Sequence, residues 1–300
     1  MTNKKIDIVG VQIDLGASQK GVAMGPSAIR YAGLKDGFKG MDYDVNDKGD
    51  IIPLRDGESK PDMLHCEQVI DANKRLYHEV YDSLENGRVP VVLGGDHSIA
   101  AGSISAVSKF YEDKGPIGVI WIDAHGDWND NHTSETGNMH GMPYSAACGF
   151  GPDEMVDYGQ KPCYVSTKHC VQVAGRDFDK LEAERMRNAG MNIFPIYDVD
   201  RRGMYEVMKE AIRIASEGTV GIHLSFDVDA VDPAYAPGTG TPVLDGITAR
   251  EAFLAAEMVA ESGKLLSIDM VEVNPILDEG NKTGRLACEL ILSSFGKSVF

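Results

Sequence analysis

Short apolar runs alternate along this chain with segments whose apolar residues recur every three or four positions. Val91–Leu93 and Val119–Ile122 are continuously apolar, which is typical of strands that helices cover on both faces. The segment 67–86 instead has helical spacing of its apolar residues. The pattern predicts strands at 6–14, 89–93, 118–123, 170–175, 192–197, 221–227 and 265–271, and helices at 67–86, 98–111, 179–189, 203–216 and 248–261.

Strand–helix alternation over the whole length predicts an α/β fold with a doubly wound, mainly parallel sheet. Neither a repeat nor a linker rich in Pro, Gly or Ser divides the chain, so residues 1–300 are expected to form a single catalytic domain. A (β/α)₈ barrel is the alternative at this length. Both architectures place an active site at the carboxyl ends of the strands.

Four of the predicted strands end in polar clusters. Successive side chains of an extended chain alternate in direction, so residues at i, i+2 and i+4 can converge. By this reasoning Asp123, His125 and Asp127 share one face, as do Asp227 and Asp229. The other two clusters are Gly94-Gly95-Asp96-His97-Ser98, where the glycines permit a sharp turn, and Glu272-Val273-Asn274-Pro275.

Four aspartates and two histidines at one sheet edge would be costly to bury without cations. Two divalent ions would balance the four carboxylates and form a hydrolytic site of known type. Oxygen and imidazole ligands without thiolates suit Mn²⁺, and Co²⁺, Ni²⁺ or Zn²⁺ are possible. Each cluster alone could be a cap or a solvated loop, but their shared position after apolar strands favours a dinuclear metal site.

Composition narrows the function classes further. The chain has 29 Lys and Arg against 46 Asp and Glu, a net charge of −17, which argues against nucleic acid and anionic membranes as partners. The five cysteines form no CxxC pair, which argues against a disulfide framework. The sequence has neither a signal-peptide pattern nor a run of about 18 apolar residues, so we expect a cytoplasmic protein.

The ordered motifs resemble those of bacterial members of the arginase family of ureohydrolases over essentially the full length. The resemblance implies a three-layer α/β/α fold, two Mn²⁺ ions per subunit and hydrolysis of the cationic guanidino substrate L-arginine to L-ornithine and urea. It also implies a homo-oligomer, and we favour a hexamer over a trimer because the chain ends soon after its last helix. The matching segments are 21–33, 94–98, 123–127, 137–143, 225–233, 240–243 and 272–283.

The resemblance also implies a role for each site residue. His140 would protonate the leaving amino group, Glu272 would receive the guanidinium, and Asp127 would orient the attacking hydroxide. The implied ligands of one ion are His97, Asp123, Asp127 and Asp227, and those of the other are His125, Asp123, Asp227 and Asp229.

The loop before His140 is implied to bind the amino-acid end of the substrate. Thr136 stands where arginases usually have Ser, and Trp128 replaces a smaller aliphatic residue, so the loop could be repacked or the pocket mouth narrowed. An agmatinase, or another guanidino-compound hydrolase, and a noncatalytic metal-binding homologue remain alternatives. The implied substrate contacts are Asn129, Ser134, Thr136 and Asn138 for the α-carboxylate, Asp179 with Glu182 behind it for the α-amino group, and Thr241.

Overall fold

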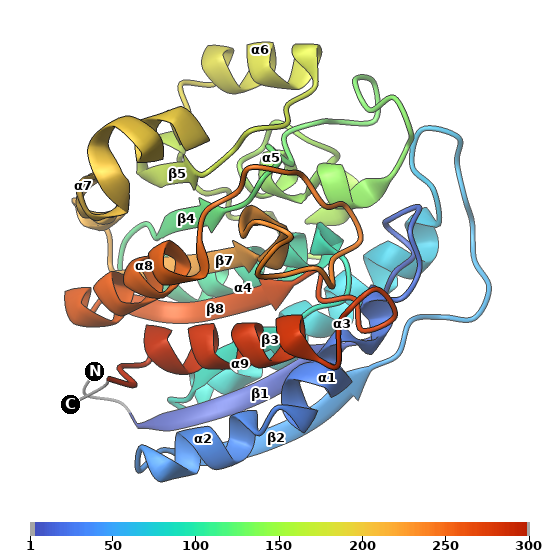
Figure 1. Cartoon of the computed structure of the whole chain (residues 1–300). Coiled ribbons are helices and arrows are strands. Elements are labelled where there is room, and N and C mark those ends of the chain that lie inside the picture. The colour runs from blue at the N-terminus through green and yellow to red at the C-terminus, as the bar shows by residue number, and fades with distance from the viewer. Residues whose placement is uncertain (1–3, 299–300) are drawn as a thin grey trace.

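A wholly parallel sheet of eight strands lies at the centre of the computed structural model, which describes residues 4–298 (Figure 1). The strand order is β2-β1-β3-β8-β7-β4-β5-β6. Because β2 and β6 are free edges, the sheet is open and the barrel alternative is wrong. The strands are β1 (Lys5–Val11), β2 (Asp44–Ile51), β3 (Val89–Leu93), β4 (Gly118–Ile122), β5 (Cys170–Val173), β6 (Asn192–Phe194), β7 (Ile222–Asp227) and β8 (Leu265–Val271).

Helices cover both faces of the sheet, which confirms the predicted three-layer α/β/α class. Alternate side chains of one strand enter different cores: Ile120 and Ile122 of β4 face one layer, and Val119 and Trp121 face the other. The first core is closed by α1 (Gly25–Tyr31), α2 (Leu34–Gly40), α7 (Ile196–Ser216), α8 (Ala249–Ser262) and α9 (Lys282–Ser294). The second is closed by α3 (Cys66–Glu85), α4 (Ala100–Tyr111), α5 (Pro143–Ala147) and α6 (Lys180–Asn188).

The apolar pattern missed the edge strand β2 and misplaced some boundaries. The β2 sequence DVNDKGDI is mostly polar because this edge strand is largely accessible to solvent. The strand predicted at 192–197 ends at Phe194, since Pro195 precedes the first residue of α7. That helix begins before the predicted residue 203 and is kinked at Gly203. The pattern also did not predict α1, α2, α5 and α9.

None of the helices in residues 4–298 combines the length and the apolar character that a membrane crossing requires.

The turn after β3 depends on close backbone packing at Gly95. A Cβ atom there would lie 1.8 Å from the carbonyl oxygen of Ile13, which belongs to the segment following β1. Gly95 itself donates to the Val11 carbonyl at 3.0 Å, so the two segments cannot separate without losing this bond. The glycine is therefore needed for a close approach of two backbones, and it holds the start of the turn that carries His97.

We expect Gly95→Ala to lower the free energy of unfolding by about 1–3 kcal/mol through this overpacking. Denaturant titration would measure the change. Gly40→Ala is the matched control, because a Cβ atom at Gly40 has no neighbour within 4 Å and the residue lies at the end of α2. Equal stability of the Gly95→Ala and Gly40→Ala proteins would contradict the packing argument.

Candidate metal centre and adjoining cavity

The acidic cluster lies at the carboxyl ends of four neighbouring strands. The sheet order places β3, β8, β7 and β4 side by side at the centre of the sheet (Figure 1). His97 follows β3, Asp123 follows β4, Asp227 ends β7 and Glu272 follows β8. Residues that are up to 175 positions apart in sequence therefore meet at one edge.

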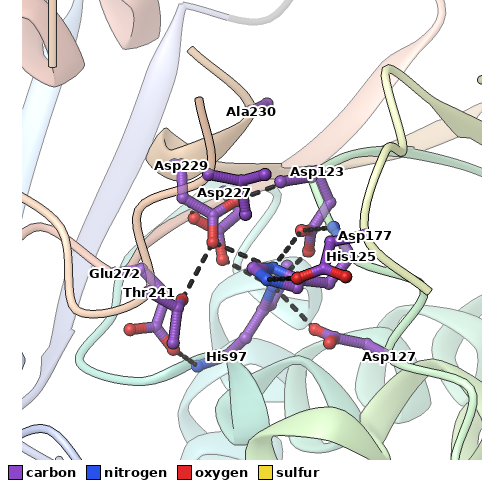
Figure 2. Close-up of polar contacts among 12 residues, drawn as sticks. His97, Asp123, His125, Asp127, Asp177, Asp227, Asp229, Ala230, Thr241 and Glu272 are labelled. Carbon is purple, nitrogen blue, oxygen red and sulfur yellow. Dashed lines mark hydrogen bonds and ion pairs between the residues drawn. The ribbon is translucent and has the colours of Figure 1, made fainter. Parts of the chain in front are cut away.

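One ring nitrogen of His97 is the meeting point of three carboxylates. Its Nδ1 lies 3.0 Å from Asp123 Oδ2, 3.1 Å from Asp127 Oδ2 and 3.2 Å from Asp227 Oδ2 (Figure 2). All four side chains are buried. Ligands at right angles around an ion at about 2.1 Å lie about 3 Å apart, so these separations suit a shared cation.

A second group shares Asp123 with the first. His125 Nδ1 lies 3.0 Å from Asp229 Oδ2 and 3.4 Å from Asp123 Oδ1 (Figure 2). Ligand atoms of Asp123, His125 and Asp229 fall within 4.8 Å of one another, as do those of His97, Asp123 and Asp127. The predicted ligands therefore converge as two groups that Asp123 joins.

Turns, and not the alternation of an extended chain, bring these side chains together. β4 ends at Ile122, before the first aspartate, and Asp127 has a positive φ of 48°. Asp227 ends β7 and its carboxylate accepts a hydrogen bond from the backbone N–H of Asp229 at 2.8 Å. The geometric reason for convergence given by the sequence pattern is therefore wrong, although the residues do meet.

The electrostatics of the cluster favour replacement of protons by cations. Burial and the nearby charges of Asp229 and Asp123 raise the pKa of Asp227 well above its usual range. Burial and the charge of Asp123 raise the pKa of Asp127 to about 6. Burial lowers the pKa of His97, but its carboxylate neighbours outweigh this and raise it well above normal. Without cations, these buried carboxylates could lie this close together only with protons bound among them.

The donor set fits a metal ion at the atomic level. Among the described residues His97 Nδ1 is buried without a hydrogen-bond partner, while its Nε2 lies 2.9 Å from Ser225 Oγ. An Nε2–H that donates to Ser225 leaves a lone pair on Nδ1, which is the state that a ligating histidine needs. Imidazole and carboxylate ligands suit Mn²⁺, Co²⁺, Ni²⁺ or Zn²⁺.

A cavity opens from the cluster towards the loop 129–138 and the start of α6. Glu272 is nearly fully buried behind His140; its Oε1 lies 3.1 Å from His140 Nδ1 and accepts the backbone N–H of His97 at 2.9 Å. The cavity therefore joins the ligand cluster to the expected substrate contacts. Its lining comprises His125, Asp127, Asn129, Ser134, Glu135, Thr136, Asn138, His140, Gly141, Asp177, Asp179, Glu182, Asp227 and Thr241.

The structure brings all the predicted substrate-binding residues to this cavity. Asn129 Nδ2 donates to Asp179 Oδ2 at 2.9 Å, which joins the loop to the N-cap of α6. Thr241 Oγ1 donates to Asp229 Oδ2 at 3.0 Å, at the metal end. Burial raises the pKa of Glu182 to about 8, and its Oε1 accepts the backbone N–H of Trp128 at 2.8 Å.

The two departures from the arginase pattern have different positions. Thr136 lines the cavity, and its Oγ1 accepts the backbone N–H of Asn138 at 3.1 Å. Trp128 is fully buried and packs against the rings of Tyr144 and Phe150, with centroid distances of 5.2 and 5.7 Å. Trp128 therefore supports the loop from behind and does not narrow the cavity.

Several supporting residues were not predicted. Ser225 and Trp121 each lie two positions before an aspartate, so the strand period could have placed them beside the site. The Trp121 ring stacks on His97 at 4.0 Å, and its Nε1 donates to Asp123 Oδ2 at 2.9 Å. No pattern in the sequence places Arg176 beside the site. Its guanidinium donates to four backbone carbonyls, those of Asp229, Ala230, Val243 and Leu244.

Comparison with known proteins agrees with this geometry. The model of the Arginase family matches residues 4–296. Arginase of Bacillus caldovelox is 45% identical to this chain over 99% of both sequences, and arginase of Brevibacillus brevis is 44% identical over 98% of both. A solved structure of the Bacillus caldovelox arginase covers 99% of this chain with a TM-score of 0.94, and this chain covers 100% of it at 44% identity.

Proposed function

This chain belongs to the arginase family, and on that premise we propose that it hydrolyses L-arginine to L-ornithine and urea. One observation carries the proposal: a single cavity joins the buried His and Asp cluster to a polar loop and an acidic helix start. The cluster suits the guanidinium end of arginine, and the loop suits the amino-acid end.

We propose Mn²⁺ as the metal, held by His97, Asp123, Asp127 and Asp227 at one position and by His125, Asp123, Asp227 and Asp229 at the other. Ions bound there would activate water as a nucleophile near neutral pH. Asp127, which lines the cavity, would orient this nucleophile towards the substrate.

His140 delivers the proton that the leaving amino group needs. Burial lowers its pKa, but the hydrogen bond and charge of Glu272 outweigh burial and raise the pKa to about 9. The imidazole is therefore protonated at neutral pH and can act as a general acid. Glu272 fixes the ring through Nδ1 and adds negative charge that attracts the substrate guanidinium.

The amino-acid end of arginine would lie between the loop and α6. Asn129, Ser134, Thr136 and Asn138 offer amide and hydroxyl groups to the α-carboxylate. Asp179 offers negative charge to the α-amino group, and Glu182 lies behind it and completes the capping box of α6. This division of roles supports arginine over a guanidine without a carboxylate.

We also propose a cytoplasmic homo-oligomer, with a hexamer favoured over a trimer. The cysteines support a reducing compartment, because the structure holds all five as free thiols. The hexamer stays a prediction, and Val299 and Phe300 lie outside the described residues.

Urea and ornithine release by purified, Mn²⁺-loaded protein tests the proposal, with agmatine as the comparison substrate. We expect urea from L-arginine at a rate at least about tenfold above that from agmatine, because a site built to bind a polar group discriminates strongly against analogues that lack it. Urea from agmatine alone would favour an agmatinase. Metal binding without urea from either compound would favour a noncatalytic homologue.

A further inference from the structure

Arg185, on the second turn of α6, donates hydrogen bonds to three groups around the substrate loop. Its Nη1 donates to Asp130 Oδ2 at 2.5 Å, and its Nε donates to the carbonyl of Trp128 at 3.4 Å. Its Nη2 donates to the carbonyl of Phe150 at 2.5 Å. One guanidinium therefore joins α6, the loop and the segment after α5.

These contacts lie on both sides of Asn129. Arg185 contacts the residue before Asn129 and the residue after it, while the Asn129 backbone N–H donates to the Gly141 carbonyl at 3.0 Å. The Asn129 side chain donates to Asp179 through Nδ2. Its Oδ1 is buried without a hydrogen-bond partner among residues 4–298. Asn129 is thus held from several directions at the cavity wall.

The loop side of the contact is itself ordered by Asp130. Its Oδ1 accepts the backbone N–H groups of His132 and Thr133, both at 2.9 Å, and its backbone carbonyl accepts the N–H of Ser134 at 3.0 Å. The Asp130 side chain is 14% exposed and that of Arg185 is 27% exposed, so water screens the pair only partly. The ion pair therefore anchors a folded turn that ends at Ser134.

We propose that Arg185 is a positioning residue that sets the affinity for the α-carboxylate of the substrate. It locks Asn129 and the turn to Ser134 against α6, whose N-cap is Asp179 and whose first turn carries Glu182. This inference rests on the proposed arginine hydrolysis. The planar guanidinium can serve three acceptors from one position, which a lysine ammonium cannot do in the same geometry.

The experiment compares Arg185→Met, Arg185→Lys and Asp130→Asn in the Mn²⁺-loaded protein. We expect Arg185→Met to raise KM for L-arginine about tenfold and to change kcat less than about twofold, since loosening a binding loop weakens ground-state and transition-state binding alike. The Kd of L-ornithine, measured by calorimetry, should rise by a similar factor. Arg185→Lys should have an intermediate effect, and the Arg185→Met/Asp130→Asn double variant should be no worse than the poorer single variant.

Arg187→Met is the matched control, because it removes an exposed arginine from the same helix. It should leave KM and the Kd of L-ornithine unchanged, and all variants should bind Mn²⁺ as the unmodified protein does. An unchanged Kd of L-ornithine in Arg185→Met would overturn the inference, and so would a loss of kcat with KM unchanged. Absence of urea from the unmodified protein would instead refute the proposed function, which keeps the two failures distinct.

Discussion

Asp123→Ala should remove both metal ions and lower kcat for L-arginine at least about 10³-fold, since a metal ion contributes several kcal/mol of transition-state stabilisation. Asp123 belongs to both of the ligand groups that converge in the structure. Its Oδ2 lies beside His97 and its Oδ1 beside His125, so alanine would remove an oxygen from each group. Asp123 is also fully buried, and its loss would leave the two imidazoles without their shared counter-charge.

Metal content by elemental analysis and urea release would measure these two effects together. Asp229→Ala is the graded comparison, because Asp229 belongs to only one ligand group and should cost one ion at most. Asp200→Ala removes an exposed carboxylate from α7 and should change neither quantity. Two ions retained per Asp123→Ala subunit would refute the assignment of Asp123 as a ligand shared by the two positions.

The sequence predicted the composition of the site better than it predicted how the site is built. Polar clusters after apolar strands identified the cluster residues, because parallel strands bring their carboxyl ends to one sheet edge. The order β3-β8-β7-β4, which makes four such ends neighbours, follows from long-range packing and leaves no local signature. The sequence also did not predict the turn at Asp127, since the positive φ of this residue depends on its surroundings.

Residues that support the site were the hardest to predict. Arg185 and Asp130 are 55 positions apart, and each alone resembles an ordinary surface charge. The sequence allowed Trp128 to narrow the cavity, whereas in the structure it packs against Tyr144 and Phe150. The apolar pattern did not predict β2, because this edge strand needs little burial and its sequence is mostly polar. Tertiary contacts decided all of these cases.

His140→Asn should lower kcat about 10²–10⁴-fold while both metal ions remain bound, since this is the usual contribution of a general acid. His140 lines the cavity and is held by Glu272, and it belongs to neither ligand group. Its backbone N–H bond to the Gly16 carbonyl does not need the imidazole, so the local chain should keep its path. Asparagine can still donate a hydrogen bond to Glu272 but cannot supply a proton at neutral pH.

The same metal and urea measurements separate this effect from that of Asp123→Ala. An unchanged Mn²⁺ content with a lower kcat and an unchanged Kd of L-ornithine would place the loss in the chemical step. His78→Asn is the matched control, because it removes a histidine from α3, outside the cavity lining. A kcat within about threefold of the unmodified protein would contradict proton transfer by His140, and the water that enters the cavity would then have to protonate the leaving group.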